Sequence, residues 1–161
     1  MFAYLRFLFT STNQHGIHSP FVYEYVTKCL YNKQQLKLPV SFKVLVKSLN
    51  YFKYHTIQFI GADKTSEEII NLHCPNILII EGSADVLAGE IIDLDNQKLI
   101  IENLTNNSML FMIGIHKNIN NLEQWKKVKT MEHVRVTIDL FYCGLVFFRK
   151  EQAKEHFKIR V

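Results

Sequence analysis

The chain has 161 residues, of which 48% are hydrophobic and 21% charged, and its formal net charge is +4. This composition excludes a disordered chain, and the length allows one domain with a substantial core but not two of ordinary size. Lys and Arg never occur in runs of more than two. The mild basicity therefore gives only weak support for a nucleic-acid partner, because nucleic-acid-binding proteins usually concentrate their charge.

The cysteines indicate neither a disulfide framework nor a zinc site. Cys29, Cys74 and Cys143 are odd in number and widely separated, and no CxxC pair occurs. We expect free thiols in a reducing cytoplasm and no metal, with Cys143 reactive only if it is exposed. The apolar start MFAYLRFLFT carries Arg6 and lacks a small-residue cleavage site, so it is a poor signal peptide. No stretch approaches the roughly 18 apolar residues of a membrane span, and we expect a cytoplasmic protein.

The spacing of apolar residues predicts helices over residues 1–54, an N-terminal helical extension. Ser19 and Pro20 provide an N-cap and a first-turn proline for one helix, and another helix follows Pro39. From residue 55 the apolar period changes, and strands and helices alternate. Residues 55–161 are therefore expected to form an α/β domain, and the two parts to make one compact unit.

The expected elements of the α/β domain can be given by their sequences. The strands are TIQFIG, PNILIIEG, QKLIIENL, SMLFMIGI, HVRVTIDLF and GLVFFRKEQ, and the helices are KTSEEIINLH with Thr65 or Ser66 as its cap, SADVLAGEIID, and NNLEQWKKVKTM. The last two strands are joined by a tight turn at Tyr142, Cys143 and Gly144. This order predicts an open, mostly parallel sheet with helices on both faces and a C-terminal antiparallel hairpin.

Two stretches carry a more specific signal, HGIHSPFVYEYVTKCLY at residues 15–31 and VRVTIDLFYCGLVFFRKEQAKEHFKIR at residues 134–160. Together they resemble the beginning and the end of a family of class I S-adenosylmethionine-dependent methyltransferases common in Bacteroidetes. The resemblance implies a Rossmann-like sheet whose first strand ends in an acid and a glycine-rich turn. Such a turn lets the backbone approach the cofactor, and a helix N-terminus follows it.

The loop that matches this turn, FIGADKTS, departs from the family's pattern. Phe59 stands where the family has an acid, and Lys64 and Thr65 stand where a second glycine is expected. Gly61 matches the first glycine. Asp63 could accept a hydrogen bond from an ammonium group of the cofactor, although its position is not the family's.

The end of the second strand matches the family better, because Glu81 and Gly82 stand where an acid would receive the ribose hydroxyls. The expected cofactor contacts are thus Gly61, Asp63, Glu81 and Gly82. Since the first loop is altered, we expect these contacts to be vestigial. S-adenosylmethionine is the implied cofactor, and we expect its binding to have been lost.

The third site that the resemblance implies, a pair of aspartates after a later strand, lacks its carboxylates in this chain. Counting back from Trp125, the family's paired aspartates fall on Ile113 and Gly114. Carboxylates there would act as a general base or bind a metal, which isoleucine and glycine cannot do. His116 is a candidate substitute base, although a single histidine after a strand is more often a surface residue. We therefore expect no catalytic residue.

The length predicts a shortened sheet. The residues after the helical extension suffice for about four strand–helix units of roughly 25 residues each. A full seven-stranded sheet with all its helices would need more. Surface that lost units once covered would then need another cover, such as a partner protein or a second copy of the chain.

Three functional hypotheses follow. The leading one is a degenerate methyltransferase-like protein without catalysis, which serves as a protein-binding or scaffolding module. The second is an active S-adenosylmethionine-dependent methyltransferase with an altered loop. The third is a nucleic-acid or ribonucleoprotein-associated module, whose bases would stack on an aromatic run interleaved with lysines: Lys47, Tyr51, Phe52, Lys53 and Tyr54.

Overall fold

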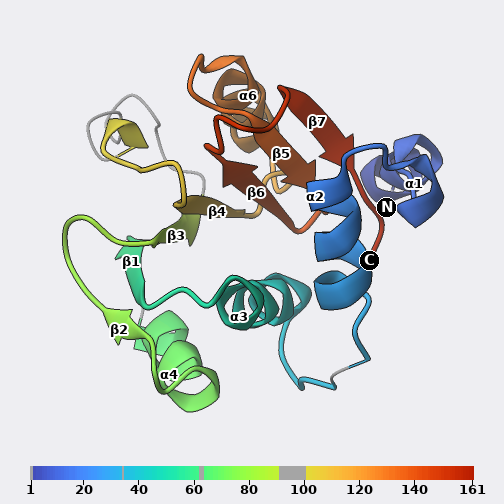
Figure 1. Cartoon of the computed structure of the whole chain (residues 1–161). Helices are drawn as coiled ribbons and strands as arrows, with labels where there is room; N and C mark the ends of the chain where they lie inside the picture. The colour runs from blue at the N-terminus through green and yellow to red at the C-terminus, as the bar shows by residue number, and fades with distance from the viewer. Residues whose placement is uncertain (1, 34, 62–63, 91–100) are drawn as a thin grey trace.

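The computed structural model describes residues 2–33, 35–61, 64–90 and 101–161, and it is an α/β protein with a seven-stranded sheet in the order β2-β1-β3-β4-β6-β5-β7 (Figure 1). The strands are β1 (Thr56–Ile60), β2 (Leu78–Ile79), β3 (Val86–Glu90), β4 (Met109–Ile113), β5 (Val136–Asp139), β6 (Cys143–Phe147) and β7 (Glu155–Lys158). The helices include α1 (Phe2–Thr10), α2 (Pro20–Glu24), α3 (Val40–Phe52), α4 (Lys64–His73) and α6 (Ile119–Thr130). A π-helical segment, Tyr25–Leu30, continues α2.

Among these strands, β6 runs against the others. The strands β1 to β4 pair in parallel, and so do β5 and β7, whereas β6 is antiparallel to both β4 and β5. The carboxyl ends of the other six strands therefore meet at one edge of the sheet, called the carboxyl edge below. The predicted mostly parallel sheet with an antiparallel C-terminal hairpin is confirmed.

Apolar layers cover both faces of the sheet, as the sequence predicts. On one face α2, α3 and α4 pack over Ile57, Phe111 and Phe147. On the other face α6 packs over Leu110 and Val146. Helices α2 and α3 of the N-terminal extension are thus part of the main core.

Several local predictions are confirmed. The Ser19 hydroxyl accepts a hydrogen bond from the Val22 amide at 3.4 Å, and Pro20 opens α2. The helix expected after Pro39 is α3, and β1, β4, α4 and α6 lie where their patterns place them. The expected cap of α4 is wrong, because Thr65 and Ser66 both lie within the helix.

The expectation of fewer than seven strands is wrong. The strands are short, and β2 has only two residues. The segment 80–85 carries the chain from β2 to β3 without a helix, although parallel strands are usually joined by a dozen or more residues. The Asp85 carboxylate fixes this connection by accepting hydrogen bonds from the amides of His55 at 2.8 Å and Thr56 at 3.0 Å. Seven strands fit because this crossover omits its helix.

Three predictions of element type or position are also wrong. Within the stretch SADVLAGEIID, Val86–Glu90 form β3 and not a helix, since Val86, Leu87 and Ala88 are buried between the layers, and residues 91–93 lie outside the described residues. The described end of QKLIIENL is helical at Ile101, which packs on the α6 face, and residues 97–100 lie outside the described residues. The hairpin turn lies before Cys143, around Phe141, and β7 continues the sheet beyond it.

Cys143 is consequently not a turn residue. It lies in β6, is fully buried, and this burial raises the pKa of its thiol well above the ordinary range. An exposed reactive thiol at this position is therefore excluded. No helix in the described part of the chain is long and apolar enough to cross a membrane.

Gly144 and Trp125 fix α6 against the sheet. A Cβ atom at Gly144 would lie 2.6 Å from two atoms of the Trp125 ring. We expect Gly144→Ala to lower the free energy of unfolding by about 1–3 kcal/mol, because the buried indole has no room to move. Urea unfolding checks this value. The same substitution in a Trp125→Leu background should cost much less, and an equal cost in both backgrounds would contradict this packing.

Candidate functional site

The strand order reverses between β1 and β3, because the chain leaves β1 for β2 on one side while β3 lies on the other. In open α/β sheets, ligands bind beyond the carboxyl ends of the strands at such a switch point. Gly61 follows β1 directly, is exposed, and has a φ of +64°, which favours glycine. Gly61 thus lies where a cofactor turn belongs, whereas Asp63 lies outside the described residues.

The other two expected cofactor contacts lie in the exposed connection from β2 to β3. Pairing of Ile79 with Ile57 leaves β2 beside the first half of β1, and the chain turns away at Glu81. Gly82 has a φ of +106° and open space around its Cα. It lines a cavity of about 440 Å³ whose other walls include Gln58 and Leu87, and neither Gly61 nor Glu81 is among its lining residues.

The residues present at the first loop do not fit the cofactor that the resemblance implies. Phe59 is partly buried and packs against the main core, so no acid stands near the end of β1. Lys64 and Thr65 form the first positions of α4, and their side chains stand where close backbone approach would need a glycine. No step of methyl transfer can be derived from these side chains.

The strand end after β4 is equally without carboxylates. Ile113 packs against the core, and the Gly114 carbonyl accepts a hydrogen bond from the Asn121 side chain at 2.8 Å. Nearby, Lys117 pairs with Glu90 at 3.0 Å, but both side chains are more than half exposed, and such pairs contribute little. Within the described residues, no group of three or more His, Cys, Asp or Glu is placed to hold a metal.

His116 is enclosed and not a surface residue. Its Nε2 lies 2.9 and 3.1 Å from the two carboxylate oxygens of Asp139, at the carboxyl end of β5. The ring stacks on Phe141 with a centroid distance of 4.9 Å, and Phe7 of α1 meets it edge-on at 5.8 Å. The sequence interpretation missed this pair, because Asp139 is 23 positions away in the chain.

A histidine oriented by a buried aspartate has the arrangement of a general base. A base must also reach the proton that it removes. Only 14% of the His116 side chain is exposed, and no hydroxyl or thiol of the described residues donates to it. Asp139 accepts a further hydrogen bond from the Phe141 amide at 2.9 Å. The pair therefore supports the hairpin turn, in which Phe141 has a φ of +69°.

Helix α1 covers this part of the carboxyl edge. The Tyr4 ring lies 4.9 Å from that of Phe141 and 5.9 Å from that of Tyr142, and Phe7 lies 5.4 Å from Phe141. The Thr12 amide, just after α1, donates to the Lys158 carbonyl at 2.8 Å. Aromatic packing and a backbone bridge thus hold the N-terminal segment over the ends of β4 and β5.

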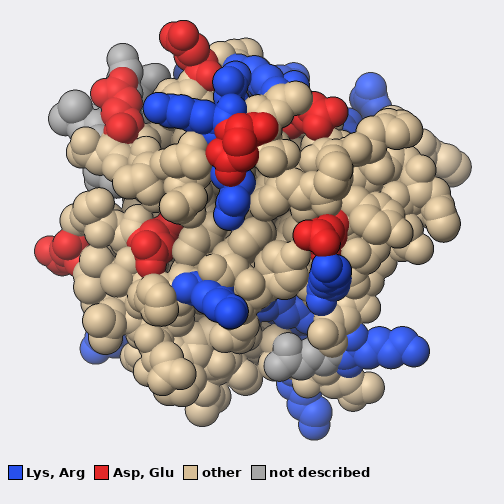
Figure 2. Space-filling model, viewed as in Figure 1, with Lys and Arg blue, Asp and Glu red and all other residues tan. Residues whose placement is uncertain are grey.

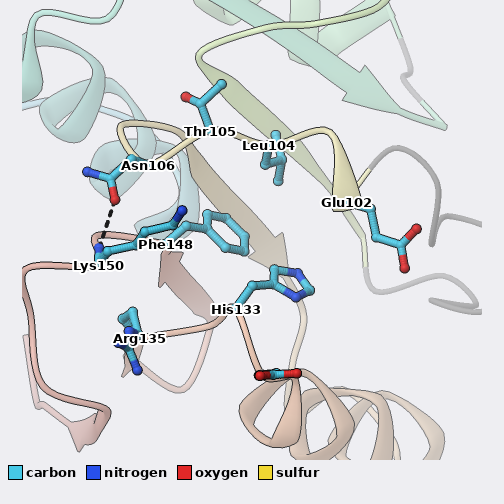
Figure 3. A pocket seen from close by; sticks show the side chains of 9 residues that line it. Glu102, Leu104, Thr105, Asn106, His133, Arg135, Phe148 and Lys150 are labelled. Atoms are coloured by element: carbon cyan, nitrogen blue, oxygen red, sulfur yellow. Dashed lines mark hydrogen bonds between the residues drawn. The ribbon is translucent and has the colours of Figure 1, made fainter.

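A cavity of about 650 Å³ lies at the opposite edge of the sheet (Figure 3). Its lining residues precede β4 and β5 or follow β6, so they surround amino ends of the parallel strands. His133 stacks on Phe148 at 5.5 Å, and the Lys150 amide donates to the Asn106 side chain at 2.8 Å. Figure 3 shows Glu102 across the cavity from His133 and Arg135. Acidic and basic residues both line the cavity, and it lies at the edge opposite the switch point between β1 and β3.

The aromatic run weighed for nucleic-acid stacking lies largely in the core. Tyr54 is buried, and Phe52 stacks on Tyr25 at 5.2 Å. The guanidinium of Arg149 lies 4.9 Å from the centre of the Phe21 ring and 5.8 Å from that of Phe52. Figure 2 shows acidic and basic side chains side by side on the visible face. Since Phe52 and Tyr54 pack in the core, this run offers few aromatic faces for bases to stack on.

No protein-family model matches this chain, and no curated protein matches it in sequence. The fold and the contacts of the described residues are therefore the grounds on which a function can be proposed.

We expect Asp139→Ala to lower the free energy of unfolding by about 2 kcal/mol, since it leaves the partly buried Phe141 amide and His116 without their acceptor. Asp139→Asn keeps an oxygen for the Phe141 amide and should cost less than about 1 kcal/mol. Denaturant unfolding of both variants measures the difference. Equal losses would show that the negative charge matters more than the support of the turn.

Proposed function

We propose that this chain is a methyltransferase-like protein that no longer transfers methyl groups and that acts by binding another protein through α1. One observation carries the proposal. Helix α1 is apolar on both sides, with one side packed on the carboxyl edge and the other open to solvent. A helix that is apolar on all sides is normally buried on all sides. The exposed side of α1 is therefore a candidate surface for a binding partner.

The side of α1 that packs on the carboxyl edge would restrict access to a catalytic site there. Tyr4 and Phe7 pack over Phe141 and His116, beyond the ends of β4 and β5. In the implied family, the catalytic carboxylates would stand at the end of the strand that is β4 here. This chain has Ile113 and Gly114 at that end and a helix packed beside it. A methyl acceptor would thus find neither a base nor open access.

The solvent-exposed side of α1 carries large apolar side chains that could bind a partner protein. Phe2 is 84% exposed, Phe9 88% and Leu5 44%. They are spaced i, i+3 and i+7, so they form one stripe along the helix, called the α1 stripe below. Arg6 is the only charged residue of the helix, and the flank of the molecule around α1 shows few charged side chains (Figure 2).

The size of the α1 stripe favours a partner with a groove. A phenylalanine carries about 200 Å² of surface, so the stripe offers on the order of 400 Å². A standard interface needs roughly 800 Å² from each partner, which two helices packed flat against each other would not reach. A groove that encloses the helix adds contacts on its flanks, and helix-in-groove complexes use anchors at this spacing.

The loss of the cofactor is supported by the loop after β1. The family resemblance supports the methyltransferase-like ancestry, and the sheet with its antiparallel hairpin agrees with it. Phe59 in the core and the two side chains that open α4 support the loss of S-adenosylmethionine binding. Retained activity with an altered loop is the alternative that turnover of S-adenosylmethionine would demonstrate.

The α1 stripe can be tested directly by the double substitution Phe2→Asp and Phe9→Asp, which should leave the fold intact because both side chains are exposed. Leu72→Asp is the matched control, since Leu72 is 76% exposed on α4. We expect one protein to co-purify in stoichiometric amount with the parent chain and with the Leu72 variant. It should be lost from the double variant.

Two results would contradict the proposal. Retention of the partner by the double variant would show that α1 is not the binding surface. A parent chain that sediments as a dimer, and a double variant that sediments as a monomer, would identify a second copy as the occupant.

A further inference from the structure

A cavity of about 480 Å³ lies beside α6, over the strands β5 and β7. Its walls come from four segments: the N-terminal stretch with Thr10, Thr12 and Gly16, helix α6 with Trp125 and Lys129, strand β5 with Thr137 and Asp139, and strand β7 with His156, Phe157 and Lys158. It uses neither the switch point between β1 and β3 nor the α1 stripe.

The floor of this cavity interrupts an otherwise apolar sheet face. Thr137 pairs with His156 and Asp139 with Lys158, so these four side chains lie side by side on one face. Elsewhere β4 and β6 present residues such as Leu110 to that face. Thr137 and Asp139 are 0% and 3% exposed. Buried polar groups at the bottom of a cavity indicate a polar ligand more than a packing role.

Positive charge surrounds the floor. Lys129 projects from the last turn of α6 and is half-buried, and Lys158 stands on the rim. Neither lysine makes an ion pair with a carboxylate in the described part of the chain. The Asp139 carboxylate on the floor adds one negative charge, which offsets part of the positive charge of the two lysines.

The electrostatic surroundings agree with an excess of positive charge. Burial lowers the pKa of Lys129, and Lys158 and Lys126 lower it further against the opposing effect of Asp139. Burial also lowers the pKa of His156, and Lys129 and Lys154 add to this shift. An anion placed among these groups would relieve the mutual repulsion.

We propose that this cavity is a binding site for a small dianionic ligand, a phosphomonoester, held by Lys129 and Lys158. Each of the two ammonium groups can form a charge-assisted hydrogen bond to a phosphate oxygen, and lysine is a common phosphate ligand. Thr10 and Thr12 also line the cavity, and their hydroxyl groups donate to backbone carbonyls of Arg6, Phe7 and Lys158. The indole Nε1 of Trp125, a wall residue, is buried without a hydrogen-bond partner in the described structure.

His156 provides a direct readout in the unmodified protein. Its Nδ1 lies 2.9 Å from the Thr137 hydroxyl, so the ring is held at the cavity wall. Titration of the protein with inorganic phosphate and with glycerol phosphate, followed by the proton resonances of its histidines, should saturate. A bound anion should raise the pKa of His156, because it opposes the effect of the two nearby lysines. Glycerol, which lacks the charge, should produce no shift.

The variants Lys129→Gln and Lys158→Gln should each weaken glycerol phosphate binding about tenfold or more, as the loss of one charge-assisted contact implies. Lys126→Gln is the matched control, since it removes the same charge from α6 without lining the cavity. Its affinity should stay within about twofold of the parent. Lys158 is exposed on the rim, so its variant tests the site even if the Lys129 variant is unstable.

Two results would overturn the assignment. One is a lack of saturable shift at His156 with either phosphate compound. The other is an equal loss of affinity in all three lysine variants, which would show that the anion responds to net charge and not to this cavity.

Discussion

The buried carboxylate of Asp139 joins the features on which this account depends. It accepts hydrogen bonds from the Phe141 amide and from His116, and so holds the left-handed turn between β5 and β6. That turn presents Phe141 to His116 and to Phe7, and these rings form the surface on which α1 lies. The same residue forms part of the floor of the cavity between β5, β7 and α6. One acid at a strand end therefore links the covered edge and the proposed anion site.

Much of the fold could be predicted from the sequence where local patterns are strong. The apolar stripe of α3, the Ser19 cap and the apolar run of β4 each specify their element without help from distant residues. The stretch that forms β3 is different, because its Ala, Leu and Glu residues favour a helix, and burial between two layers decides otherwise. The strand β7 alternates half-buried and exposed residues and is rich in charge, which is typical of an edge strand and looks like a solvated segment in the sequence.

The candidate site was less predictable, because it depends on contacts between distant parts of the chain. The absence of a carboxylate at Phe59 and at Ile113 can be read from the sequence alone, because it depends on no contact with a distant residue. The pair of His116 and Asp139 and the cover of α1 both need the register of β6 between β4 and β5. A signal was present in the strand VRVTIDLF, where an aspartate follows alternating apolar residues that point toward the core. Its place at a strand end could have marked Asp139 as a candidate site residue. Its partner, His116, could not have been found in this way.

The central proposal is that this α/β sheet, which resembles that of a methyltransferase family, does not bind S-adenosylmethionine. Calorimetric titration of the purified chain with S-adenosylmethionine and with S-adenosylhomocysteine tests it most directly. The account predicts no binding at millimolar ligand, because the turn after β1 lacks its acid and its second glycine. Micromolar binding, about −8 kcal/mol, would contradict it and would direct attention to Gly61 and Glu81 as working contacts.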